Sequence, residues 1–123
     1  MCQAPQPALT LKRVVGFGYP WFARMAALQG TVELIAIISL DGSVAKVDVK
    51  SGAEPLASPA KEALSKWQLA GCHSVAATCE AKFISRFILS GSCNAAAHCP
   101  TGFEVDMPGE VTVTAKAIKA IMN

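Results

Sequence analysis

Residues 29–52 read QGTVELIAIISLDGSVAKVDVKSG and carry the strongest signal for the fold. Two β-rich runs, Thr31–Leu40 and Val44–Lys50, flank the dipeptide Asp41-Gly42. An Asp-Gly pair between β-branched runs predicts a β-hairpin, because glycine adopts positive φ angles without steric cost. The second run alternates, so one face of that strand should be buried and the other solvated. The buried face is expected to carry Ala45, Val47 and Val49, and the solvated face Lys46, Asp48 and Lys50.

A helix is expected on each side of this hairpin. Pro20 fits a first helical position and predicts a short helix over Trp21–Leu28. Ser58-Pro59 predicts the start of a second helix, which runs to about Trp67. The apolar face of the first helix is expected to carry Phe22, Met25 and Ala26. In the second helix we expect Ala60, Ala63, Leu64 and Trp67 inside and Lys61, Glu62, Ser65 and Lys66 outside.

Three further segments have strand character: a short run over Leu9–Val15, then Ala81–Leu89, and finally Val111–Ala117. In the run over Ala81–Leu89, one side is expected to carry Phe83, Phe87 and Leu89, and the other Ile84, Arg86 and Ile88. The stretch from Cys93 to Gly102 is expected to be a tight loop. The predicted class is therefore α+β, a small antiparallel sheet with helices on one face and an extra C-terminal strand.

The chain has 123 residues, the size of one domain. We expect a flexible lead over residues 1–8, where Pro5 and Pro7 lie, and a single domain over residues 9–123. A hydrophobic content of 52% with 16% charged residues excludes a disordered chain. The net charge of +2 offers no basic field for nucleic acid. The longest apolar run, Leu34–Leu40, is too short to span a membrane.

Four of the five cysteines form two close pairs, Cys72/Cys79 and Cys93/Cys99. This pattern favours disulfides and an oxidising compartment such as the bacterial periplasm. Pairing within each loop is the simplest of several connectivities, and free buried thiols are the alternative. A zinc site built from the four cysteines with His73 and His98 is a weaker alternative, because structural zinc sites usually have tighter Cys-x₂₋₄-Cys spacing.

The N-terminus Met1-Cys2-Gln3 shows neither the charged nor the apolar region of a signal peptide. The sequence is therefore read either as cytosolic or, in agreement with the cysteine pairs, as a mature form. Cys2 is the unpaired cysteine and could begin a lipoprotein.

Catalytic groups are scarce. No Gly-x-Ser-x-Gly, His-Glu-x-x-His, P-loop or Rossmann pattern occurs. No Cys-x-x-Cys motif is present to lower a thiol pKa. Asp48, Glu80, Glu104 and Asp106 are acids by type only and are read as surface charges. We therefore expect no catalytic residue, no metal and no cofactor.

A series of short motifs resembles the C-terminal domain of the energy transducer TonB over about residues 14–89. The most informative positions are Tyr19, Pro20, Gly30, Asp41, Gly42 and Trp67. The series also includes Ala23-Arg24, Gln29, Val32, Ser43-Val44, Val47, Val49, Ser51-Gly52, Pro55-Leu56, Ala60 and Ala63-Leu64. Residues 14–89 would then form the β-β-α-β core of the family, and residues 90–123 a disulfide-bearing extension.

The resemblance implies a non-enzymatic periplasmic domain that binds an extended segment of an outer-membrane TonB-dependent transporter in energy transduction. Such binding is β-strand addition, in which main-chain hydrogen bonds supply affinity. The family usually receives the segment on the strand matching Ala81–Leu89. The expected edge residues here are Lys82, Phe83, Ile84, Ser85, Arg86, Phe87 and Ile88.

Three departures from the family pattern qualify this expectation. No membrane anchor or Pro-rich spacer precedes the core, so contact with inner-membrane motor proteins would need an anchor in a longer precursor. Gly18 stands where transporter-binding members have a glutamine before Tyr-Pro. The tail after Leu89 carries a strand that could cover the receiving edge. The alternatives are a secreted or lipid-anchored structural domain that has lost its transporter, and a cysteine–histidine enzyme; a homodimer is left open.

Overall fold

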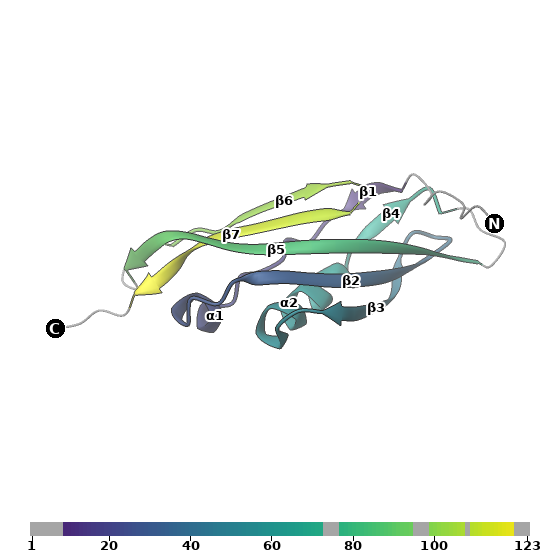
Figure 1. Ribbon diagram of the computed structural model, residues 1–123. Coiled ribbons are helices and arrows are strands. Elements are labelled where there is room, and N and C mark those ends of the chain that lie inside the picture. Colours follow the sequence, from purple (N-terminus) through teal and green to yellow (C-terminus); the bar gives the residue numbers. More distant parts are fainter. Residues whose placement is uncertain (1–8, 73–76, 95–98, 108, 120–123) are drawn as a thin grey trace.

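The structure is a computed structural model and describes residues 9–72, 77–94, 99–107 and 109–119. Strands and helices follow one another along this part of the chain as shown in Figure 1. They are β1 (Thr10–Arg13), α1 (Trp21–Met25), β2 (Gly30–Ser39), β3 (Val44–Ser51), α2 (Glu54–Leu64), β4 (Gln68–Ala70), β5 (Thr78–Asn94), β6 (Gly102–Asp106) and β7 (Glu110–Lys119). The expected flexible lead over residues 1–8 lies outside the described residues.

The main sheet has five strands in the order β3-β2-β5-β7-β6, and β1 pairs with β4 in a separate two-stranded sheet. Both helices lie on the same side of the five-stranded sheet (Figure 1). The α+β class is therefore confirmed. The expectation of an antiparallel sheet is wrong for one pair, because β5 and β7 are parallel. After β5 the chain reverses direction to form β6 and reverses again to form β7. β7 lies between β6 and β5, so it runs in the same direction as β5.

The predicted hairpin is confirmed as β2 and β3. Asp41 supports its turn, because one carboxylate oxygen accepts hydrogen bonds from the N–H and the hydroxyl of Ser43 at 2.9 and 2.7 Å. Gly42 has a φ of +92°, and a Cβ there would lie 1.9 Å from the carbonyl oxygen of Leu69. The turn therefore needs glycine both for its backbone conformation and for the close approach of β4.

The expected burial of β3 is only partly right. Val47 is buried, but Ala45 is exposed and Val49 is 39% exposed. β3 is an edge strand, and its register with β2 is irregular near both ends. The inward-facing side chains are therefore buried only in the central part of the strand.

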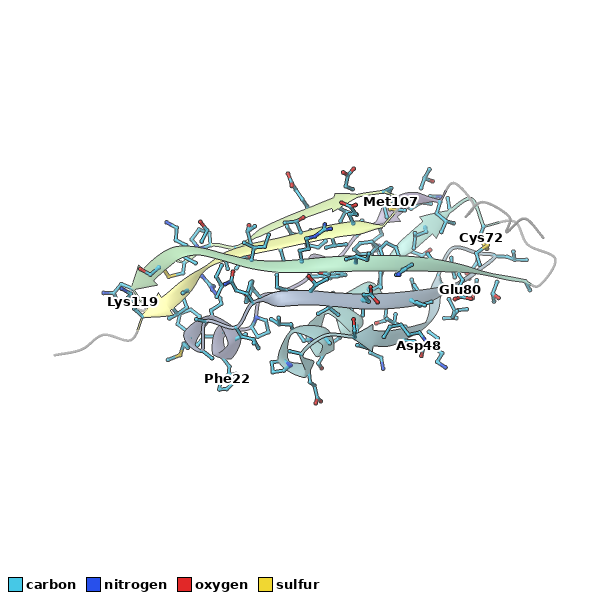
Figure 2. All side chains as sticks on the ribbon, in the orientation of Figure 1. Phe22, Asp48, Cys72, Glu80, Met107 and Lys119 are labelled. Carbon is cyan, nitrogen blue, oxygen red and sulfur yellow. A yellow bond between two sulfur atoms is a disulfide. The ribbon has the colours of Figure 1, made fainter. Side chains whose placement is uncertain are left out.

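The first helix is shorter than expected and buries a different face. It ends at Met25, and Phe22 is 72% exposed and points away from the sheet (Figure 2). Met25 and Ala26 are also exposed, whereas Ala23 and Arg24 are buried. The expected apolar face is therefore wrong.

The second helix begins earlier than expected, at Glu54, with Pro55 in its first turn. Ser58 and Pro59 lie inside the helix, so Ser58 is not its N-cap. The additional first turn buries Leu56 and Ala57. This burial of apolar surface stabilises the earlier start, and a helix that began at Ser58 would lack it. The expected burial of Ala60, Ala63 and Leu64 is confirmed, but α2 ends at Leu64 and not near Trp67, which is buried beyond the helix.

Trp67 follows α2 and lies in the centre of the core, with 1% of its surface exposed. Its ring centroid lies 5.5, 5.4 and 6.4 Å from those of Phe17, Phe83 and Phe103. Its indole N–H donates to the carbonyl oxygen of Val15 at 2.8 Å. Two strands next to this cluster, β4 and β6, were not predicted from the sequence. The stretch expected to be a tight loop is shorter than expected, because β5 continues to Asn94 and β6 begins at Gly102.

Candidate functional site

β5 contains the residues expected to receive a partner, and it is an inner strand of the sheet. β2 pairs with its first half, and β7 pairs with it from Ile84 onward. The expectation that Val111–Ala117 joins the sheet is confirmed. β7 pairs with the main chain over Ile84–Ile88, so this side of β5, which the sequence analysis left open, is not a free edge. Partner contact by Lys82–Ile88 itself stays a prediction.

The side chains of β5 divide as the alternation predicts. Phe83, Ser85 and Phe87 are buried, and the Ser85 hydroxyl has no hydrogen-bond partner within the described part of the chain. The opposite face carries Lys82, Ile84, Arg86 and Ile88. Lys82 lies 3.8 Å from Glu33 of β2, and Arg86 lies 3.5 Å from Glu110 of β7. These exposed ion pairs are screened by solvent and contribute little to stability.

Tyr19 and Pro20 position α1 against the sheet. The Tyr19 hydroxyl donates to the carbonyl oxygen of Leu28, and its ring meets that of Phe87 edge-on at 5.4 Å. Burial raises the pKa of Tyr19 above its ordinary value, and the charge of Arg24 partly opposes this rise. Pro20 is the N-cap of α1, one position before the first helical position that was expected for it. In this chain both residues therefore hold the fold together.

Gln29 extends β2 by one step. Its side-chain oxygen accepts a hydrogen bond from the N–H of Leu89 at 2.7 Å. The register of β2 and β5 ends at Gly30 and Phe87, so the main chain of β2 does not reach Leu89. The Gln29 amide thus satisfies a donor that would otherwise lie beyond the end of the ladder.

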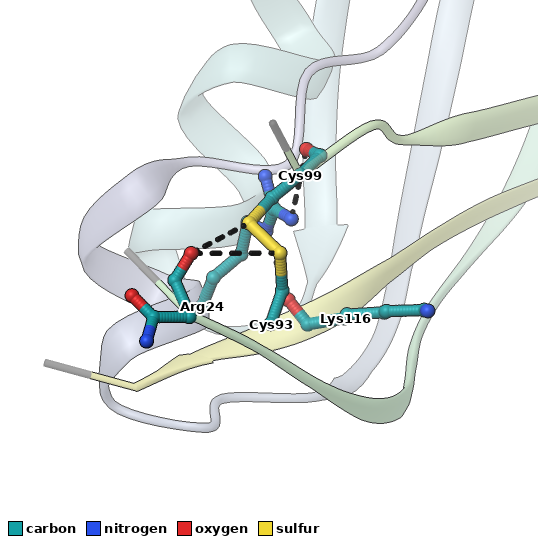
Figure 3. The surroundings of a disulfide bond; sticks show 5 residues. Arg24, Cys93, Cys99 and Lys116 are labelled. Carbon is teal, nitrogen blue, oxygen red and sulfur yellow. Dashed lines mark hydrogen bonds between the residues drawn. A yellow bond between two sulfur atoms is a disulfide. The ribbon is translucent and has the colours of Figure 1, made fainter. Parts of the chain in front are cut away.

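Arg24 has a role that the periodicity of α1 did not predict. It is 4% exposed, and its Nε and Nη2 atoms donate to the carbonyl oxygens of Lys116 at 3.0 Å and Cys99 at 3.1 Å (Figure 3). Its guanidinium carbon also lies 5.7 Å from the centre of the Trp21 ring. Arg24 therefore fastens α1 to the C-terminal part of the chain. Its place in the Ala23-Arg24 motif was the only available signal.

Two local disulfides are present. Cys72 pairs with Cys79, and Cys93 pairs with Cys99, with Cα–Cα distances of 5.8 and 6.0 Å. The first is buried beside the hairpin, and the second joins the end of β5 to the segment leading into β6. Cys2, His73 and His98 lie outside the described residues.

The acids singled out from the sequence are not brought together into a catalytic group. Asp48 is ion-paired with Lys46 at 3.5 Å, and Glu80, Glu104 and Asp106 are exposed. Within the described ranges, no three histidine, cysteine, aspartate or glutamate residues lie close enough to hold a metal ion. The geometry instead offers surfaces for contact with another chain.

The open edges of the five-stranded sheet are those of β3 and β6. A groove of about 470 Å³ lies between β3 and α2. β3 contributes Ala45, Lys46, Val47 and Asp48, and α2 contributes Ser58, Lys61, Glu62 and Ser65.

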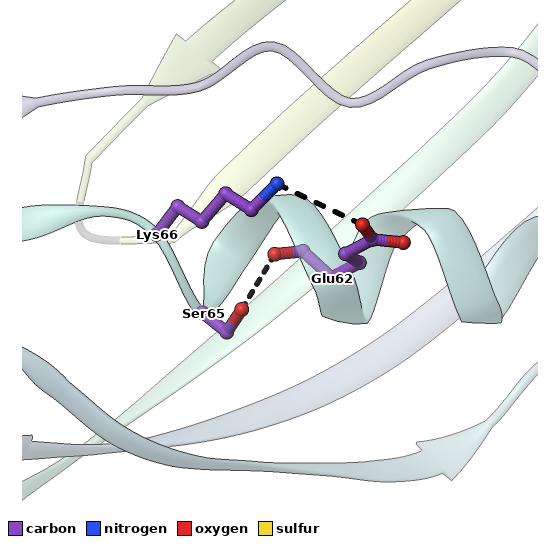
Figure 4. Close-up of polar contacts among 3 residues, drawn as sticks. All are labelled: Glu62, Ser65 and Lys66. Carbon is purple, nitrogen blue, oxygen red and sulfur yellow. Dashed lines mark hydrogen bonds and ion pairs between the residues drawn. The ribbon is translucent and has the colours of Figure 1, made fainter.

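Two of the α2 residues that line this groove interact with residues of the same segment. The Ser65 hydroxyl donates to the carbonyl oxygen of Glu62 at 2.6 Å, and Glu62 lies 3.7 Å from Lys66 (Figure 4).

Comparison with known families identifies the fold. The family model for the Gram-negative bacterial TonB protein C-terminal domain matches residues 16–89, more than half of the chain. The chain belongs to this family. Searches of curated proteins and of solved structures found no match.

Membership in the TonB C-terminal family makes this a TonB-type domain of transport energy transduction, a non-enzymatic class that operates in the periplasm of Gram-negative bacteria. In the described part of the chain, no helix is both long and apolar enough to cross a membrane. The family match ends at Leu89, so β6 and β7 lie beyond it. β7, which pairs with β5, and β6 beside it therefore lie outside the matched residues.

Proposed function

We propose that this domain binds an extended segment of an outer-membrane TonB-dependent transporter by β-strand addition in the periplasm. The family match over residues 16–89 carries the proposal. The open edges of the sheet support it, because strand addition needs unpaired main-chain donors and acceptors. Coupling to inner-membrane motor proteins would then run through a membrane anchor in a longer precursor. Self-association into a homodimer would compete with the transporter for the same strand edges.

Two observations favour a second function. β7 pairs with β5 where the family resemblance puts the partner, and the motif residues Tyr19 and Trp67 are committed to the core. A domain with these features could serve as a structural envelope domain, secreted or lipid-anchored, that has lost transporter binding. The two functions differ in whether the folded domain retains a transporter.

The test is capture from the source bacterium. The oxidised domain, immobilised through an added C-terminal tag, is incubated with detergent-solubilised outer membranes, and retained proteins are identified by mass spectrometry. We expect a TonB-dependent transporter to be enriched over beads that carry the reduced, urea-unfolded domain. Absence of any such transporter, with circular dichroism showing a folded domain, would favour the structural function.

A further inference from the structure

β3 lies at one edge of the sheet, whereas β5 is paired on both sides, and a groove borders the unpaired side of β3. Side chains from both faces of β3 line this groove, the outward-facing Lys46 and Asp48 together with the inward-facing Val47. Residues of both faces can border one groove only along the edge of a strand. The groove therefore follows the unpaired side of β3, and α2 forms its second wall.

The main chain of β3 has unpaired hydrogen-bonding groups along this edge, at Val47 in the groove and at Val49 just beyond its lining. The N–H of Ser39, in β2, donates to the carbonyl oxygen of Ser43, just before β3 begins. Every second residue of β2 counted from Ser39, including Ile35, therefore directs its main-chain N–H and C=O groups toward β3. Ile35 lies opposite Asp48, which makes Asp48 a hydrogen-bonded partner. Its neighbours Val47 and Val49 therefore direct their N–H and C=O groups outward. The regular part of the β3 ladder thus presents two residues to an added strand.

The charges around the groove indicate what kind of segment would fit. Asp48 is engaged by Lys46, and Glu62 is engaged by Lys66. Lys61, which lines the groove, and Lys50, on β3, are exposed and have no ion-pair partner among the described residues. Glu54, at the start of α2, is also exposed and has no ion-pair partner among the described residues, so the two lysines leave a net positive charge at this edge. This charge complements an acidic side chain.

We propose that the edge of β3, with the α2 groove beside it, binds an extended peptide segment that carries an acidic residue. The segment adds to β3 through the main chain of Val47 and Val49, and Lys61 pairs with its carboxylate. This inference rests on the proposed function and names the edge that serves it. It leaves the pairing of β5 with β7 intact, so binding requires no strand to be displaced.

The probe is a heptapeptide of alternating valine and threonine with an N-terminal glutamate, compared with a twin that carries lysine instead. Binding is followed by amide chemical shifts of the ¹⁵N-labelled, oxidised domain. We expect the acidic peptide to shift the amides of Val47 and Val49 and its lysine twin to bind more weakly. Shifts confined to β5 and β7, or equal binding of the twins, would overturn the proposal. Concentration-dependent shifts at β3 without peptide would also overturn it, because a second copy would then be the occupant.

Matched variants test the backbone and the charge separately. Val49→Pro removes both the valine side chain and the outward N–H. Val49→Ala also removes the valine side chain but keeps the N–H. Proline is tolerated at edge strands where the N–H faces solvent. We expect Val49→Pro to weaken peptide binding by about tenfold relative to Val49→Ala, because a main-chain hydrogen bond is lost and the ring blocks close approach. Equal affinities of these two variants would contradict strand addition at β3.

Lys61→Glu tests the charge without altering the strand, and Lys12→Glu, at an exposed position of β1, is its control. We expect Lys61→Glu to weaken binding of the acidic peptide about threefold or more and Lys12→Glu to leave it unchanged. Similar effects of the two reversals would mean that only net charge matters and would overturn the site.

The capture experiment separates this inference from the proposed function. If the Val49→Pro domain retains a transporter as well as the Val49→Ala domain does, transporter binding stands and the β3 site fails. If the unaltered domain retains no transporter, the proposed function fails, and the peptide shifts still decide whether β3 is a binding edge.

Discussion

Replacing Trp67 by alanine should destabilise the domain more than any other single truncation of an aromatic residue in this core. The indole is 1% exposed and packs against Phe17, Phe83 and Phe103. Truncating a buried aromatic residue to alanine costs about 3–5 kcal/mol, through lost transfer free energy and the cavity that remains. Domains of this size have unfolding free energies of about 5–15 kcal/mol, so Trp67→Ala should remove a large share.

The assay is urea unfolding of the oxidised protein, followed by far-ultraviolet circular dichroism and repeated as a thermal melt. For a chain of this length, about 3–5 °C is lost per kcal/mol, which predicts a fall in Tm of about 10–20 °C. Trp67→Phe is the matched control, because it keeps most of the ring packing and removes the donor to Val15. The control should lose about 1–2 kcal/mol.

A Trp67→Ala domain that melts within 2 °C of the parent protein would show that the indole does not anchor the core. Equal losses for Trp67→Ala and Trp67→Phe would show instead that the hydrogen bond to Val15, and not the ring packing, is the main contribution.

Three further predictions concern the turn, the single tyrosine and the disulfides. Gly42→Ala should cost about 1–3 kcal/mol or more in urea unfolding, because its Cβ meets the Leu69 carbonyl at a φ of +92°; an unchanged midpoint would contradict the turn geometry. Tyr19 should titrate above its ordinary value of 10.0 in absorbance at 295 nm, and its stabilising effect, complete below pH 10.0, should vanish as the pH rises through the raised pKa; ionisation at 10.0 in the folded state would contradict its burial. Peptide mapping should find Cys72 linked to Cys79 and Cys93 to Cys99, and loss of either bridge should cost at most about 2.5 kcal/mol, since each loop is short; five free thiols after oxidative folding would contradict both bridges.

Local patterns in the sequence were sufficient for the centre of the fold. The turn at Asp41-Gly42 depends on the positive φ angle of Gly42 and on the hydrogen bond from Ser43 to the Asp41 side chain, two residues away. Both are local, so the hairpin could be predicted without knowledge of the other strands. The buried face of α2 could also be predicted, because helical spacing itself places Ala60, Ala63 and Leu64 on one side. The TonB-type motifs lie in this same region.

The start of α2 and the buried face of α1 depended on contacts with distant parts of the chain. Local capping preferences favour a helix start at Ser58, but burial of Leu56 on the sheet extends α2 back to Glu54. In α1, the acceptors of Arg24 are main-chain oxygens of Lys116 and Cys99, far along the sequence. Periodicity within a five-residue helix contains no information about such partners.

The hairpin, the core-facing side of the second helix and the alternation along β5 are therefore encoded in local sequence patterns. Which strand edges remain open depends on long-range pairing. Whether β5 or β3 can accept another strand depends on where β7 pairs, and that pairing joins residues separated by a disulfide loop and a second hairpin. Alternation specifies which face of a strand is buried but not which neighbour lies beside it, because a strand's hydrogen-bonding groups are the same for every partner.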